Sequence, residues 1–300
     1  MSEVLVCDWG TSSFRLMKIG ATGEIISQIS TDRGIKSLEG AGMEPYLKAQ
    51  MSAIGGANYP VVLCGMVGSG IGWHEVPYVD CPASKASLAA ALVQVPDTDL
   101  QAWCVPGVKR ITRSGIADVM RGEETQIIGW LTQASPQEQA KATLCLPGTH
   151  SKWVHIEGGE ICGFSTAFTG ELYALLTAHS VLVQGTQAHS TDAFTAGLAA
   201  SAGEAGLIHQ LFNARSRTVL GLQSGAASAS YLSGLLIGSE VAAMARELGQ
   251  GERVHLVCGD NLAAPYGEAL QYFGIEYRHY SGSTYSALGL SAIAREANVL

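Results

Sequence analysis

The chain has 300 residues, of which 47% are hydrophobic and 15% charged, so it holds enough apolar material for a sizeable core and, by length, about two domains. Its formal net charge is −8, and no Lys/Arg cluster offers a footprint for a phosphate backbone, which argues against a nucleic-acid partner. No apolar run reaches the roughly 18 residues of a membrane span, and the start shows no signal-peptide pattern. The seven cysteines are scattered without C-x-x-C spacing, as expected of reduced cysteines in a cytoplasmic protein.

The first thirty residues predict three consecutive strands. Residues 3–7 form a short apolar run, residues 14–19 alternate between apolar and polar, and residues 24–30 form a third run. A polar turn, residues 8–13, joins the first two strands, and a turn at residues 21–23 joins the last two. The chain therefore opens on an antiparallel meander.

The same arrangement recurs in the middle of the chain. Strands are expected at residues 143–146, 152–156 and 160–168, with a turn at 147–151 that aligns Gly148-Thr149-His150-Ser151 with Gly10-Thr11-Ser12-Ser13. Such a repeat predicts two related domains. We expect an N-terminal domain over 1–140, which carries the first turn, and a C-terminal domain over 141–300, which carries the second turn. We also consider an arrangement in which the last helix, 283–297, packs back on the N-terminal domain.

The rest of the chain alternates between helical and extended patterns. Further strands are expected at residues 60–65, 254–258 and 276–279. Helices are expected at residues 43–54, 84–92, 118–132, 170–182, 191–202, 226–248, 262–273 and 283–297. Alternating strands and helices, with a meander opening each half, predict an α/β chain with mixed sheets.

The first turn has the composition of a phosphate-binding loop. Gly10 lets the backbone approach phosphate oxygens, and the hydroxyls of Thr11, Ser12 and Ser13 can donate to them. Asp8, at the end of the preceding strand, is our candidate for holding Mg²⁺ beside the nucleotide phosphates. An ordinary β-turn has a similar composition, but the repetition of the turn favours the functional interpretation.

The second turn lacks the carboxylate, because Leu146 stands where Asp8 stands in the first. Phosphate can still be held by Gly148, Thr149 and Ser151, and Lys152 could add positive charge; the alternative is that His150 and Lys152 are solvated turn residues. After the strand at 254–258, Gly259 and Asp260 precede a helix and are candidates for the nucleoside part of ATP.

Three acidic residues, Asp118, Glu123 and Glu124, lie near the start of the helix expected at 118–132. One of them could accept the proton of an attacking hydroxyl, with Glu123 first, then Glu124, then Asp118. The alternative is that they stabilise the positive end of the helix dipole.

A glycine-rich loop, residues 65–78, follows a buried strand and is a candidate sugar-binding loop. Its candidate ligands for sugar hydroxyls are Ser69, Trp73, His74, Glu75 and Tyr78. An acidic substrate also needs a cationic side chain to bind its charged group, and the sequence offers several candidates. We retain Arg15 and Arg121 as substrate-binding candidates. The full set of cations is Arg15, Arg33, Lys36, Arg113, Arg121 and Lys152.

Several motifs together resemble the 2-dehydro-3-deoxygalactonokinase family, from residue 4 to about residue 294. They are Asp8-Trp9-Gly10-Thr11-Ser12, Gly65-Met66, Gly72-Trp73, Pro77-Tyr78, Cys81-Pro82, residues 118–126, residues 146–153 and Phe168-Thr169-Gly170-Glu171-Leu172. The resemblance implies a two-domain actin-like (ribonuclease H-like) ATPase fold with duplicated mixed sheets and an interdomain cleft. The N-terminal domain would carry the first phosphate loop and the sugar-acid side, and the C-terminal domain the nucleotide side. It also implies ATP and Mg²⁺, and phosphorylation of 2-dehydro-3-deoxy-D-galactonate at its 6-hydroxyl in galactonate catabolism. Gly70-Ile71 stands where the family usually has Arg-Gln, which could alter substrate preference.

Alternative functions remain on the same fold. They are a kinase for another sugar acid, an exopolyphosphatase-type phosphatase and a non-catalytic nucleotide switch. The few Lys and Arg residues argue against a polyanion channel, and the chain shows no insertion that would serve as a partner surface for a switch. A homodimer is also considered, since many soluble enzymes are symmetric dimers.

Overall fold

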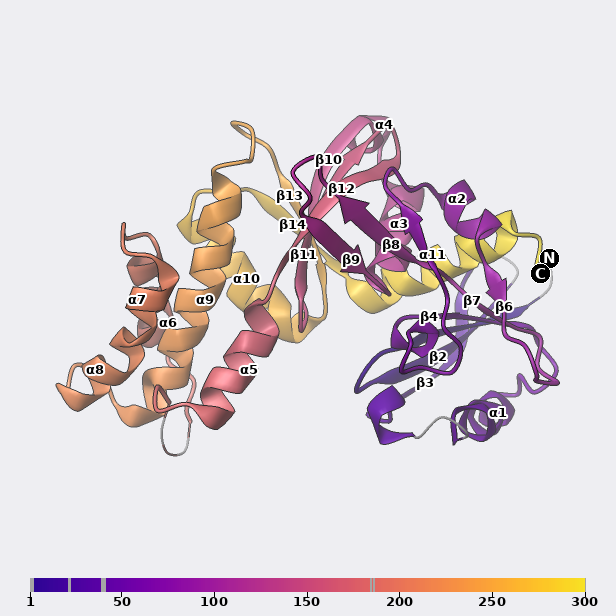
Figure 1. Cartoon of the computed structure of the whole chain (residues 1–300), viewed down its shortest axis with the longest axis horizontal. Helices are drawn as coiled ribbons and strands as arrows, with labels where there is room; N and C mark the ends of the chain where they lie inside the picture. Colours follow the sequence, from indigo (N-terminus) through magenta and orange to yellow (C-terminus); the bar gives the residue numbers. More distant parts are fainter. Residues whose placement is uncertain (1–2, 21–22, 39–41, 184, 186, 300) are drawn as a thin grey trace. The chain divides into compact units, whose positions relative to one another are not determined.

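The structure, a computed structural model, describes residues 3–20, 23–38, 42–183, 185 and 187–299 (Figure 1). It divides into two compact units. The first unit comprises Met1–Lys141, Val154–Ser165 and Ser281–Leu300, and the second comprises Ala142–Trp153 and Thr166–Tyr280.

The first unit contains a six-stranded mixed sheet in the order β3-β2-β1-β4-β7-β6. The strands β1 (Val4–Trp9), β2 (Phe14–Ile19) and β3 (Ile25–Thr31) are antiparallel, so the opening meander is confirmed. The predicted turn at 21–23 falls largely on residues 21 and 22, which lie outside the described residues. The strands β4 (Val61–Cys64) and β7 (Ala102–Cys104) run parallel to β1, and β6 (Val93–Gln94) closes the far edge.

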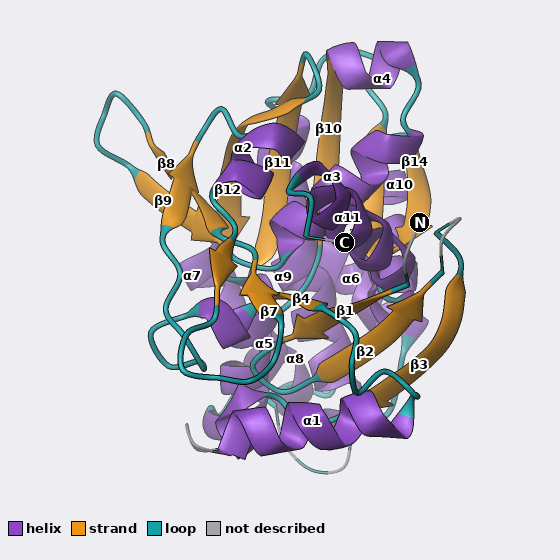
Figure 2. Ribbon diagram, turned by 90° about the vertical axis from the view of Figure 1, so that its right-hand side faces the viewer, coloured by secondary structure: helices purple, strands orange, loops and turns teal. Residues whose placement is uncertain are grey.

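Helices cover the sheet because its central strands β1 and β4 are largely apolar and buried. Leu47 and Met51 of α1 (Met43–Ala53) pack with Leu5 and Cys7 in one buried cluster, and α1 lies along the sheet in Figure 2. The helix α11 (Gly282–Glu296) contacts β1 and β4 and packs closely on α3 (Glu123–Gln133). A side chain at Gly129 or Gly289 would collide with the backbone of the opposite helix.

A second, three-stranded sheet in the first unit was missed by the sequence analysis. It has the order β5-β8-β9, with β5 at Tyr78–Asp80, β8 at Gly107–Ile111 and β9 at Ala117–Met120. The prediction of a helix from residue 118 is therefore wrong at its start, because β9 pairs with β8 and Gly122, at φ 111°, separates β9 from α3. Two short helices complete the unit, α2 (Lys85–Ala90) and α4 (Pro136–Ala140).

The five-stranded sheet that follows repeats the strand order of the first one. Its order is β12-β11-β10-β13-β14, so a three-strand meander again precedes a parallel strand. The strands are β10 (Lys141–Leu146), β11 (Ser151–Glu157), β12 (Glu160–Ala167), β13 (Val254–Cys258) and β14 (Tyr277–Ser281). The predicted duplication of a mixed sheet is confirmed.

Six helices of the second unit are described. They are α5 (Thr169–His179), α6 (Thr191–Ser201), α7 (Leu207–Leu211), α8 (Asn213–Val219), α9 (Ser228–Ala245) and α10 (Asp260–Tyr272). The sequence analysis predicted all of them except α7 and α8. α6 and α9 lie side by side (Figure 1), because Gly197 and Gly234 leave no room for a side chain between the two backbones. None of the helices in the described part of the chain combines the length and the apolar character of a membrane span.

All seven cysteines are unpaired, and five of them are buried, whereas Cys81 and Cys162 are half-exposed.

Candidate active site

The first turn is held rigidly by backbone hydrogen bonds. The amide of Gly10 donates to the Ser13 carbonyl at 2.9 Å, and the amides of Ile35 and Lys36 donate to the carbonyls of Gly10 and Thr11 at 3.1 and 3.2 Å. Ser12 and Ser13 are exposed, and the hydroxyls of residues 11–13 make no hydrogen bond within the described residues. They are therefore free to donate to a ligand such as phosphate.

Asp8 lies in β1 and is paired in register with Cys64 of the parallel strand β4 and with Arg15 of β2. The Ser286 hydroxyl donates to Asp8 Oδ2 over a long 3.5 Å. Burial raises the pKa of Asp8, while the charge of Arg15 and hydrogen bonds from Ser286 and Cys64 oppose that rise. The carboxylate thus keeps acceptor capacity at a strand end.

The surroundings of Asp8 suit a hard cation. Gly65, at φ +90°, lies so close that an added Cβ would be 3.5 Å from Asp8 Oδ1, and Gly122 lies against Gly65 in turn. Within the described residues no three His, Cys, Asp or Glu side chains form a metal cluster. Mg²⁺ commonly uses only one or two carboxylates together with substrate phosphates, so a single Asp8 carboxylate fits it.

The two glutamates that begin α3 differ in accessibility. Glu123 is half-buried, and its Oε2 accepts the Arg121 amide at 3.1 Å. Glu124 is fully buried, its Oε2 accepts the Gly122 amide at 2.6 Å, and its Oε1 has no partner. Burial, and then the neighbouring charge of Glu123, raise the pKa of Glu124 to about 8. Asp118 lies apart in β9, so it does not belong to the first turn of α3.

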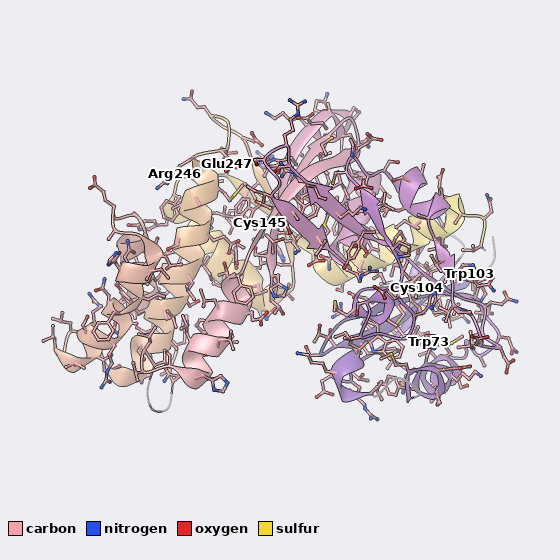
Figure 3. The ribbon with its side chains drawn as sticks, in the orientation of Figure 1. Trp73, Trp103, Cys104, Cys145, Arg246 and Glu247 are labelled. Atoms are coloured by element: carbon pink, nitrogen blue, oxygen red, sulfur yellow. The ribbon has the colours of Figure 1, made fainter. Side chains whose placement is uncertain are left out.

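The candidate sugar-binding loop contributes side chains with different surroundings. The Ser69 hydroxyl donates to the Met66 carbonyl at 2.7 Å and so closes a local turn. Trp73, labelled in Figure 3, is half-buried against the core, whereas Glu75 is exposed beside Gly70. Tyr78 begins β5, and its ring lies under the Arg121 guanidinium, 4.3 Å from ring centroid to Cζ.

The second turn separates into an exposed part and a buried part. Thr149 and His150 are exposed; His150 stacks on Phe168, and its Nε2 lies 2.6 Å from Glu171 Oε2. Gly170 packs directly on the Gly148 carbonyl, which brings the start of α5 to the turn. Glu171 had no role assigned from the sequence, although it belongs to one of the motifs shared with the resembled family.

Ser151 and Lys152, two predicted phosphate ligands, point into the protein. The Ser151 hydroxyl donates to Glu240 Oε1 at 2.6 Å, and Lys152 Nζ donates to Thr166 Oγ1 at 2.8 Å. Glu240 of α9 also accepts from Trp153 Nε1 and from the Tyr266 hydroxyl, both at 2.8 Å. Burial, and then Glu240, raise the pKa of Tyr266 far above its usual value, so its hydroxyl stays protonated.

We expect Glu240→Ala to lower the free energy of unfolding by about 3 kcal/mol, because three buried donors lose their acceptor. Urea unfolding measures the loss. The matched control is Glu247→Ala, which removes an exposed carboxylate just beyond α9 (Figure 3). Equal unfolding midpoints for the two variants would contradict the anchoring role of Glu240.

Two cavities lie in the second unit, and one of them adjoins the second turn at Gly148. The first, of about 210 Å³, is lined by Gly148, Gly170 and Leu236 among others, and the second, of about 360 Å³, by His189 and Glu268. Both are lined by Tyr173, Ser233, Asn261 and Pro265. Gly259 and Asp260 line neither cavity, although Asn261 follows them directly. No sequence motif marked the four shared lining residues, since they are scattered over the three helices α5, α9 and α10.

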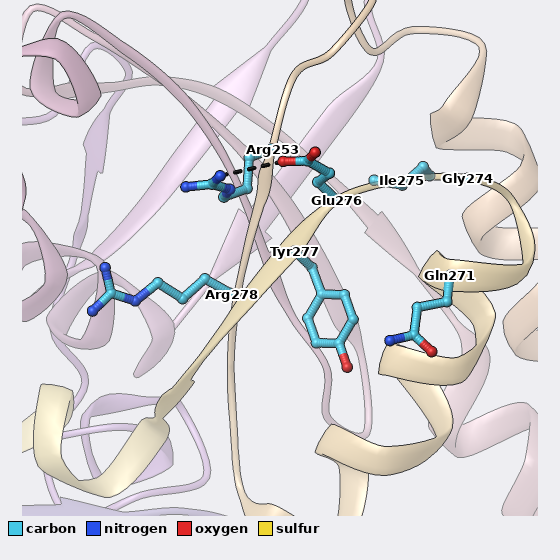
Figure 4. A pocket seen from close by; sticks show the side chains of 7 residues that line it. All are labelled: Arg253, Gln271, Gly274, Ile275, Glu276, Tyr277 and Arg278. Atoms are coloured by element: carbon cyan, nitrogen blue, oxygen red, sulfur yellow. Dashed lines mark hydrogen bonds and ion pairs between the residues drawn. The ribbon is translucent and has the colours of Figure 1, made fainter.

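A further groove of about 540 Å³ lies on the second unit, around β14 (Figure 4). Arg253 Nη2 and Glu276 Oε2 form an ion pair of 3.2 Å across it. Its lining contains none of the predicted site residues, so we assign it no part in the reaction.

The profile of the 2-keto-3-deoxy-galactonokinase family matches residues 8–293. The chain belongs to this family. The chain is 34% identical, over 295 residues, to the 2-dehydro-3-deoxygalactonokinase of Escherichia coli (strain K12), and the alignment covers 98% of each chain.

Solved structures agree with that family. A Sinorhizobium meliloti protein assigned to the same activity superposes with a TM-score of 0.88 at 34% identity, over 97% of this chain and 98% of that one. The activator of 2-hydroxyisocaproyl-CoA dehydratase from Clostridium difficile, solved with ADPNP, has a TM-score of 0.55 at 13% identity, over 99% and 96%, which shows likeness of fold alone. The actin-like α/β fold that was predicted for the chain is confirmed.

Proposed function

We propose that the chain transfers the γ-phosphoryl group of ATP to the 6-hydroxyl of 2-dehydro-3-deoxy-D-galactonate, a step of galactonate catabolism. The observation that carries the proposal is the family match over nearly the whole chain. The free hydroxyls of the first turn beside the Asp8 carboxylate support it.

In the proposed reaction the oxygen of the 6-hydroxyl forms a bond to the γ-phosphorus as the bond to the β-phosphate oxygen breaks. ADP leaves with that electron pair, and Glu123 accepts the hydroxyl proton. Gly10 to Ser13, and Gly148 with Thr149, hold the phosphates through amides and hydroxyls. Asp8 would hold Mg²⁺, which neutralises phosphate charge when bound.

The remaining site residues take supporting roles in this proposal. The nucleoside of ATP would occupy the two cavities that Tyr173 and Asn261 line, with Gly259 and Asp260 directly before Asn261 in the chain. Ser151, Lys152 and His150 would position the second turn through the contacts described above. The candidates for binding the sugar acid remain Arg15, Ser69, Trp73, Glu75 and Tyr78. Asp118 remains the third candidate for accepting the hydroxyl proton. We also keep as proposals the domains 1–140 and 141–300, a cytoplasmic location and a homodimer.

The test is a coupled ADP-release assay with Mg·ATP and four acceptors: 2-dehydro-3-deoxygalactonate, its gluconate epimer, galactonate and neutral galactose. We expect turnover of the first compound well above the others. Preferred turnover of another sugar acid would keep the kinase and change its substrate, with Gly70-Ile71 as the first place to look. No turnover of any acceptor would overturn the kinase, and polyphosphate would then be tried as a substrate.

A further inference from the structure

Arg121 is half-buried, and part of its guanidinium group is shielded from solvent. Its Nη2 donates to the Val76 carbonyl at 2.6 Å, and its guanidinium lies over the ring of Tyr78. Its Nε and Nη1 are buried and make no hydrogen bond, and an added Cβ at Gly68 would lie only 3.1 Å from Nη1. Two donors of a charged group are thus unused in the interior of the loop region.

An unsatisfied buried guanidinium is costly, because its charge and its N–H groups lose water without gaining partners. Most buried polar groups in proteins have a partner, and one explanation for a buried donor without a partner is a ligand that supplies the missing acceptor. Arg suits an oxyanion better than Lys does, because its planar N–H groups match the oxygens of a carboxylate, and its flat face can stack on an aromatic ring at the same time. The Tyr78 stack leaves the edges of the guanidinium for such a ligand.

The other cations considered from the sequence lack this combination. Lys152 Nζ is bonded to Thr166, and Arg15 is paired in register with Asp8 and acts on its pKa. Arg33 stacks on Tyr46, at 5.3 Å, but is exposed, as are Lys36 and Arg113. Of these six, in the part of the chain that the structure describes, Arg121 alone has a buried head group with unused donors.

We infer that Arg121 binds the carboxylate of the sugar acid and makes the enzyme select acids over neutral sugars. The inference rests on the proposed function. Arg121 precedes Glu123 by two residues, and its own amide donates to Glu123 Oε2. One short segment thereby presents a cation for the carboxylate end of the substrate and a proton acceptor for its hydroxyl end.

The test compares kcat/KM for 2-dehydro-3-deoxygalactonate and for its carboxamide, in which the carboxylate charge is absent. For Arg121→Gln we expect a loss of about 10- to 100-fold with the acid, expressed mainly in KM, and little loss with the carboxamide. The KM for ATP should stay unchanged. The matched control, Arg33→Gln, also removes an arginine stacked on a tyrosine and should change neither substrate.

Two results would overturn the inference. Equal losses of kcat/KM with both acceptors would mean that Arg121 has a structural role. A raised KM for ATP would mean that Arg121 contacts a phosphate of ATP. If the Gln variant unfolds, Arg121→Lys decides: it keeps the charge but loses the planar donors, so its preference for acid over carboxamide must fall several-fold. A wild-type enzyme that does not phosphorylate the acid at all would instead refute the proposed function.

Discussion

Replacing Asp8 with Asn is expected to lower kcat about 10³-fold and to leave folding almost intact. The amide keeps the shape of the side chain at the end of β1 but has no negative charge with which to hold Mg²⁺ beside the phosphates. Burial already raises the pKa of Asp8, so the loss of its charge removes a desolvation cost and should not destabilise the sheet. Steady-state rates over a range of Mg²⁺ concentrations, with thermal unfolding by circular dichroism, measure both effects.

The control for this variant is Asp32→Asn, which removes the same charge from an exposed side chain between β3 and the segment that supports the first turn. It should keep the wild-type rate. A normal kcat for Asp8→Asn would show that Asp8 does not hold the metal. A reduced kcat with a much lower unfolding temperature would assign it to the packing of β1.

The meanders and most helices could be predicted because their patterns are local. Residues 14–19 alternate except at the adjacent Leu16 and Met17 and form β2 with the predicted bounds, and residues 254–258 form β13 with the predicted bounds. The repeated Gly-Thr turn could be recognised for the same reason, since each copy lies between two such strands. Asp8 was expected at the start of the turn after a strand at 3–7, whereas it lies within β1, which continues to Trp9.

Features that depend on distant partners could not be predicted. β9 is extended because it pairs with β8, which outweighed the helical appearance of residues 118–122. Ser286 reaches Asp8 from the other end of the chain, and Glu240 reaches Ser151 from 89 residues away. The two adjacent glutamates look equivalent in the sequence, and only packing shows that Glu123 is accessible and Glu124 is buried.

That difference decides which glutamate can accept a proton from the substrate. A general base must come within hydrogen-bond reach of the proton that it takes, and geometry outranks pKa in this choice. Glu124 is fully buried, whereas Glu123 is half-buried at the start of the helix, so Glu123 is the more accessible of the two carboxylates. Glu124, with a pKa of about 8, also binds a proton at neutral pH.

Glu123→Gln is therefore expected to lower kcat about 10²- to 10⁴-fold, because the amide cannot accept the hydroxyl proton. Its matched control is Glu124→Gln, which should keep most of the rate at pH 7, since a neutral amide there replaces a protonated carboxyl. Rates of both variants at saturating substrate measure the difference. A larger loss of kcat in Glu124→Gln would identify Glu124 as the base. Equal, mild losses would indicate that both residues only stabilise the positive end of the helix dipole.

Stability against pH gives a second measurement on the control variant. The pKa of Glu124 is raised from 4.5 to about 8 in the folded protein, so between these values the folded state holds a proton that the unfolded chain has lost. The unfolding free energy of the wild type therefore falls as pH rises through that range, by an amount on the order of 5 kcal/mol. The Glu124→Gln variant has no proton to lose at this position. Its free energy of unfolding relative to the wild type should therefore rise from pH 5 to pH 8 and stay constant above pH 8. A constant difference across this range would mean that Glu124 is ionised in the folded protein and is available as a base after all.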